Sequence, residues 1–146
     1  MTRINLITPV SLTDAHLIAE IKEINQLSGS FRKSLYSKNG IDVSMIPASY
    51  TLNKGHVKFF YNKGKYLEKR FNLLVREARQ RGFKIKAEFN NEWLKNNRLD
   101  LYNDWASSYS DELIVLERIK LRISQNPDFY RYYGKPIKKP CTNTGF

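Results

Sequence analysis

Apolar side chains recur three and four positions apart over much of the chain, a spacing that predicts α-helices. The first apolar stripe consists of Leu17, Ile21 and Ile24. Ser11 can cap the start of this helix, with Asp14 three residues later in a capping-box arrangement. Gly29 interrupts the pattern. We therefore expect the first helix to end there and a second helix to cover residues 31–38.

The longest periodic stretch predicts one central helix that ends at Gly82. Its stripe is Val57, Phe60, Gly64, Leu67, Phe71, Leu74 and Ala78. A glycine at position 64 weakens a helix by about 1 kcal/mol against alanine, so it marks either a break or a close helix crossing. A last helix is expected over residues 111–125, before Pro127, and residues 41–53 form a loop. No segment alternates as a strand does. The predicted fold is all-α, a compact single domain of about three main helices with long irregular loops.

The length of 146 residues suits one domain. We expect the helical domain to cover residues 1–135 and a flexible basic tail to cover residues 136–146. The single cysteine, Cys141, lies in that tail, which excludes a disulfide within one chain. No apolar run approaches the length that spans a membrane, and no signal peptide precedes the first helix. We expect a soluble intracellular protein without a membrane partner.

The formal net charge of +11 is the unusual feature of the composition, and it favours a polyanionic partner such as nucleic acid. Basic side chains dominate residues 54–86, whereas acidic ones dominate residues 88–117. This segregation favours a directed basic face over a general solubility effect. Arg118 and Arg122 lie four apart on the last helix, where both can contact phosphates.

Residues 129–135 combine aromatic and cationic side chains in one short loop. The sequence there is Phe129-Tyr130-Arg131-Tyr132-Tyr133-Gly134-Lys135. Rings and cations together suit base stacking and phosphate contact. Alternatively, the same rings can seal the end of the helical core, and both uses stay open for different residues of the loop.

A candidate nucleophile lies at the start of the chain. A small residue after Met1 normally allows the methionine to be removed, which leaves Thr2 with an α-amine that titrates near ~8 and can attack electrophilic carbon. His16, Glu20 and Glu23 share a face of the first helix. The extended segment before the helix can reach about 30 Å, enough to bring the Thr2 amine beside Glu23. Alternatively, Thr2 has no catalytic role, and Glu20 and Glu23 simply belong to a solvated face of the helix.

Other chemistry lacks its usual residues. His56 is the only histidine besides His16, and no second Glu-x-x-His element completes a metal site. No motif activates a serine, and no glycine-rich phosphate loop is present. We expect no metal and no cofactor. A DNA-acting enzyme and a non-catalytic basic DNA-binding or architectural protein both remain possible, with a metal-dependent nuclease as a weaker third.

Three motifs resemble the phage-type pyrimidine-dimer DNA glycosylase/AP lyases, the UV-repair endonuclease V family. They are MTRINL followed by D-x-H-L-x-A-E-x-x-E within residues 1–23, GHVKFFY at residues 55–61, and the aromatic-basic run at residues 127–135. The resemblance extends to about Lys135, and only residues 88–109 are hard to match.

The resemblance implies a metal-free enzyme that excises UV-induced cyclobutane pyrimidine dimers from double-stranded DNA. The Thr2 amine would form an imine with the sugar, and Glu23 would stabilise the developing positive charge and manage the protons of β-elimination. A base opposite the lesion would leave the stack of a kinked duplex. The implied DNA-binding residues are Arg3, His16, Lys22, Gln26, Arg118, Arg122, Phe129, Tyr130, Arg131, Tyr132 and Lys135.

The chain departs from the family at three of these positions. Familiar members carry arginine at the positions of Lys22 and Gln26, and tryptophan at that of Phe129. Lys22 keeps the charge but not the bidentate fork, and Gln26 loses the charge. Thr2 and Glu23 are unchanged. We also expect a monomer that searches undamaged DNA non-specifically, in the cytoplasm of a phage's host cell.

Overall fold

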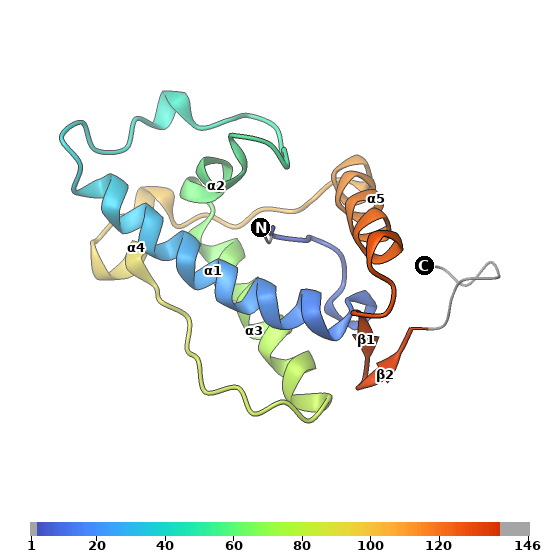
Figure 1. The fold of residues 1–146 in the computed structure, drawn as a ribbon. Helices are drawn as coiled ribbons and strands as arrows, with labels where there is room; N and C mark the ends of the chain where they lie inside the picture. The colour runs from blue at the N-terminus through green and yellow to red at the C-terminus, as the bar shows by residue number, and fades with distance from the viewer. Residues whose placement is uncertain (1–2, 138–146) are drawn as a thin grey trace.

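The computed structural model describes residues 3–137 and confirms an all-α fold (Figure 1). Its helices are α1 (Asp14–Leu35), α2 (His56–Phe59), α3 (Gly64–Gln80), α4 (Glu92–Lys95) and α5 (Tyr109–Gln125). Short 3-10 turns lie at Pro9–Ser11, Val43–Met45, Phe60–Asn62 and Leu99–Leu101. Strands β1 (Arg131–Tyr132) and β2 (Lys135–Pro136) form one small antiparallel hairpin. Within residues 3–137, no helix is both long and apolar enough to cross a bilayer.

The core forms where α1 crosses α3 (Figure 1). The predicted stripes of both helices are buried there. They include Leu17, Ile21 and Ile24 from α1, and Leu67, Phe71, Leu74 and Ala78 from α3. Helix α5 lies to one side and buries only Val115 and Ile119. The start of the chain lies between α1 and α5, and the hairpin lies beside the first turn of α1 (Figure 1).

Helix α1 continues through Gly29, so the predicted break there is wrong. Leu27 and Phe31 are buried on either side of it. Burying such a side chain stabilises by about 1.5–3 kcal/mol, which exceeds the roughly 1 kcal/mol cost of a mid-helix glycine. The predicted cap is also wrong: the Thr13 hydroxyl, not Ser11, accepts the backbone N–H of His16 at 3.1 Å.

The expected central helix is interrupted instead between α2 and α3. Lys63 has φ −130° and ψ 40°, outside the helical region. Gly64 follows, and a Cβ there would lie 2.6 Å from the indole ring of the buried Trp93. Gly64 is thus both a break and a close crossing. The indole N–H donates to the Tyr61 carbonyl at 2.9 Å, which holds α4 against this corner.

The remaining predicted elements agree with the structure apart from their boundaries. Residues 41–53 contain only the Val43–Met45 turn. Helix α5 begins two residues earlier than expected, behind a Ser108–Asp111 capping box. Pro136, the first residue of the expected tail, is in β2. Ile137 is also described, whereas residues 138–146 of that tail, with Cys141, lie outside the described residues, as does Thr2.

Candidate functional site

A cationic cleft lies between α1, α5 and the start of the chain. Its volume is about 230 Å³. The lining residues are Arg3, Asn5, Ala15, His16, Ala19, Arg118, Ile119, Arg122, Phe129 and Tyr130. Six of the predicted DNA-binding residues are among them, and they come from four separate segments. Helical spacing alone placed only Arg118 and Arg122 together.

The three arginines of the cleft repel one another. Burial lowers the pKa of Arg118, and the charges of Arg122 and Arg3 lower it further. Guanidinium groups stay protonated at neutral pH, so the cleft concentrates positive charge. This arrangement favours an anionic ligand such as a phosphate group.

His16 enters this cleft as a neutral ring. Burial, followed by the charges of Arg118 and Arg122, lowers the pKa of His16 to about 4. The ring stacks on Tyr130, with centroids 4.9 Å apart and planes 7° apart. Its Nδ1 lies 2.7 Å from the Thr13 hydroxyl. A neutral imidazole at this position can exchange hydrogen bonds with a ligand without adding charge.

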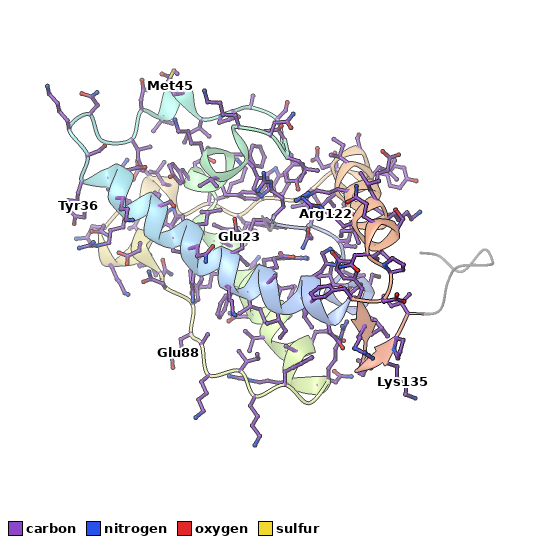
Figure 2. The ribbon with its side chains drawn as sticks, in the orientation of Figure 1. Glu23, Tyr36, Met45, Glu88, Arg122 and Lys135 are labelled. Carbon is purple, nitrogen blue, oxygen red and sulfur yellow. The ribbon has the colours of Figure 1, made fainter. Side chains whose placement is uncertain are left out.

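Glu23 lies two turns further along α1 and is half-buried (Figure 2). Burial raises the pKa of its carboxyl group, Arg3 lowers it, and Glu20 raises it. A carboxyl group whose pKa lies above the usual range is suited to taking up and releasing protons. Arg3 donates from Nε to the Leu52 carbonyl at 3.0 Å, which ties the start of the chain to the loop before α2.

The other predicted contact residues on α1 lie outside this cleft. Lys22 lines a neighbouring groove of about 470 Å³ together with Phe83, Phe129 and Arg131. Phe129 therefore borders both hollows, and it is 59% exposed. Gln26 is exposed on the same helix.

The aromatic-basic loop divides between the two uses that the sequence left open. Tyr132 donates its hydroxyl proton to the Val10 carbonyl at 2.7 Å, and its ring packs on Arg81. It therefore holds the loop in place. Arg131 and Lys135 are exposed, and Lys135 projects from the edge of the molecule far from Glu23 (Figure 2).

A buried ion pair behind the cleft was not predicted. Glu20 is fully buried, and its carboxylate accepts hydrogen bonds from Arg70 Nε at 2.7 Å and from Arg70 Nη2 at 3.0 Å. The interpretation of Glu20 as part of a solvated face is therefore wrong. Asn5 donates to the same carboxylate, and Arg70 also donates to the Ile7 carbonyl at 2.6 Å. The available signal was the position of Arg70 inside the apolar stripe of α3.

Several cations of residues 54–86 are internal and cannot belong to an external basic face. Arg70 pairs with Glu20, the Arg81 side chain is fully buried against Asp14 and Glu77, and Lys63 is buried.

Within residues 3–137, no group of three His, Cys, Asp or Glu side chains lies close enough together to hold a metal ion. On α1 itself, Glu20 points to Arg70 while His16 faces Thr13.

The fold and the cleft define a class: a helical protein whose concave, arginine-lined surface suits a nucleic acid backbone. The family comparison is more specific. The chain belongs to the pyrimidine dimer DNA glycosylase family, whose model matches residues 1–91. This match confirms the family suggested by the sequence motifs and makes DNA that carries pyrimidine dimers the substrate. It covers Arg3, His16 and Glu23 but ends before α5 and the hairpin.

Proposed function

We propose that the chain is a bifunctional enzyme in which the α-amine of Thr2 is the nucleophile. The amine nitrogen would bond to C1′ of the damaged nucleotide as the glycosyl bond breaks, and the departing pyrimidine takes up a proton. Opening of the sugar ring gives an imine between enzyme and DNA. Loss of a C2′ proton then expels the 3′ phosphate by β-elimination, which nicks the strand.

The observation that carries this proposal is the surroundings of Glu23. The carboxyl group is half-buried, has a raised pKa and interacts with Arg3, the residue bonded to Thr2. Thr2 itself lies outside the described residues. A carboxyl group in this position can balance the positive charge that develops on the sugar and then accept the C2′ proton.

The cleft beside Glu23 supplies the proposed binding surface. Arg3, Arg118 and Arg122 would contact phosphates, and the exposed ring of Phe129 would stack on a base. Such contacts neutralise phosphates whatever the sequence, so the same surface would hold undamaged DNA during a search.

Borohydride trapping on a duplex with one cyclobutane pyrimidine dimer tests the nucleophile. We expect a covalent adduct from protein whose Met1 is absent by mass, and none when Met1 is retained and displaces the amine by one residue. Thr2→Ser, which keeps the amine, is the matched control and should still be trapped. Absence of an adduct from processed protein that binds the duplex would instead favour a non-catalytic DNA-binding protein.

Glu23→Gln tests the carboxyl group. We expect nicking to fall at least ~100-fold, within the usual range for a lost acid–base group, while the duplex is still bound. Glu88→Gln makes the same change on an exposed carboxylate that does not line the cleft and should leave nicking unchanged. Normal nicking by Glu23→Gln would refute the proposed role.

A further inference from the structure

The first described residues, 3–7, run beside α1 without pairing to any strand within residues 3–137. Buried peptide groups need hydrogen-bond partners, so this segment must find them elsewhere. Ile4 is fully buried, and side chains provide hydrogen-bond partners for both its N–H and its carbonyl group. Its N–H donates to His56 Nε2 at 3.0 Å, and its carbonyl accepts the Tyr50 hydroxyl at 2.8 Å.

The two side chains that bind Ile4 are themselves held rigidly. His56 Nδ1 lies 2.8 Å from the Thr51 carbonyl. A carbonyl only accepts, so the proton is on Nδ1, which leaves Nε2 free to accept from Ile4. The Tyr50 ring packs edge-on against His56, with centroids 5.5 Å apart. Both side chains are almost completely buried, and neither lines the cleft.

We propose that His56 and Tyr50 are positioning residues that fix the backbone at Ile4 and thereby set the place of the reactive amine two residues earlier. The inference rests on the proposed function of Thr2. Two residues span at most about 7 Å, so the position of Ile4 limits the amine to a small region around it. A displacement of about 1 Å can slow a reaction roughly 100-fold.

The test compares His56→Phe, which removes the acceptor, with His56→Gln, whose Oε1 can occupy the place of Nε2. Three quantities are measured: amide hydrogen exchange at Ile4, the single-turnover rate on a dimer-containing duplex, and the Kd for that duplex. In His56→Phe we expect Ile4 exchange to accelerate at least ~10-fold and the rate to fall roughly 10–100-fold, with Kd changing less than about 3-fold. His56→Gln should recover most of the rate.

Tyr50→Phe provides a milder variant in case His56→Phe does not fold. Its matched control is Tyr61→Phe, which removes another buried hydroxyl, one that lies 3.2 Å from Ser34 and away from Ile4. We expect Tyr50→Phe, but not Tyr61→Phe, to lower the rate at constant Kd. Equal losses in the two variants would show a general stability effect and overturn the proposal.

Failure of the inference can be separated from failure of the proposed function. Unchanged Ile4 exchange in His56→Phe, or equal rate losses in His56→Phe and His56→Gln, would overturn the positioning role while leaving the amine chemistry intact. A wild-type protein that nicks the duplex but gives no trapped adduct would refute the imine. In that case Ile4 exchange and nicking rates across the variants still decide whether Ile4 must be held.

Discussion

The start of the chain and the C-terminal hairpin are both segments outside the helices that buried polar side chains hold in place, but they are held differently. Residues 4–7 are themselves buried, and their peptide groups are bound by Tyr50, His56 and Arg70. The hairpin instead rests on a cluster at its base and keeps Arg131 and Lys135 exposed. The first arrangement fixes a position, whereas the second presents a surface.

The base of the hairpin is organised by Asp14 at the first turn of α1. Its carboxylate accepts the backbone N–H groups of Tyr133 at 3.0 Å and Gly134 at 2.8 Å. Arg81 donates to Asp14 at 3.0 Å and to Glu77 at 2.8 Å. The Arg81 guanidinium also lies over the rings of Tyr132 and Tyr133. One buried cation therefore joins the hairpin to both α1 and α3.

The largest expected effect is loss of the ion pair that holds the start of the chain. Arg70→Met leaves the Glu20 carboxylate buried without its partner, which should lower the free energy of unfolding by about 3–5 kcal/mol. Urea unfolding measures it. Asp104→Asn, which breaks the exposed Lys69–Asp104 pair, is the control and should cost no more than about 1 kcal/mol. Equal effects would contradict the buried role of Arg70.

The next largest effect is expected in the pH dependence of the free energy of unfolding. Burial is the main cause that lowers the pKa of His56 and of His16 to about 4, against about 6.5 in the unfolded chain. Below pH 6.5 the unfolded state binds protons that the folded state does not. Stability is therefore complete above pH 6.5 and falls as the pH drops toward 4. Each histidine should contribute a loss of about 2 kcal/mol at pH 5.

The charged groups around the two histidines support the same direction. Burial lowers the pKa of His56, the hydrogen bond to the Thr51 carbonyl raises it by less, and the charges of Arg3 and Arg118 lower it further. Unfolding free energies of wild type and His56→Gln at pH 7 and pH 5 test this. The decrease in unfolding free energy between pH 7 and pH 5 that the two histidines cause should be roughly half as large in His56→Gln as in wild type. An unchanged decrease would show that His56 is not the titrating group.

A smaller effect is expected at the hairpin. Arg81→Met should loosen residues 129–135 and raise the Kd for dimer-containing DNA about 10-fold, because a contact surface that must order itself binds more weakly. The single-turnover rate of the bound complex should change little, the opposite of the result expected for His56→Phe. Competition binding and saturating single-turnover assays separate the two. A rate loss without a Kd change would contradict this assignment.

The smallest effect is expected for the exposed cations. Lys135→Ala should raise the Kd about 2- to 3-fold, equally for damaged and undamaged DNA. The slope of log Kd against log salt concentration should decrease by about the contribution of one phosphate contact. Kd values measured at several salt concentrations test this. Lys38→Ala, on the exposed surface after α1, should leave the slope unchanged.

Much of the site could be anticipated because its signals are local. Arg118 and Arg122 are one helical turn apart, and the motif around His16 and Glu23 lies within a single helix. The boundaries of α1 were less predictable. Ser11 and Thr13 are both capable caps, and the cost of Gly29 is outweighed by the complete burial of neighbours such as Phe31, which only tertiary packing determines.

The sequence by itself determined the helical class, the apolar stripes, the basic character and the family. Those features depend on side-chain periodicity and on motifs that span few residues. Only the tertiary structure decided which polar groups meet. Glu20 and Arg70 are 50 positions apart, and Asp14 accepts from Gly134 across 120. Such contacts form because helix packing excludes water and brings these groups within hydrogen-bond distance of one another, which no local pattern encodes.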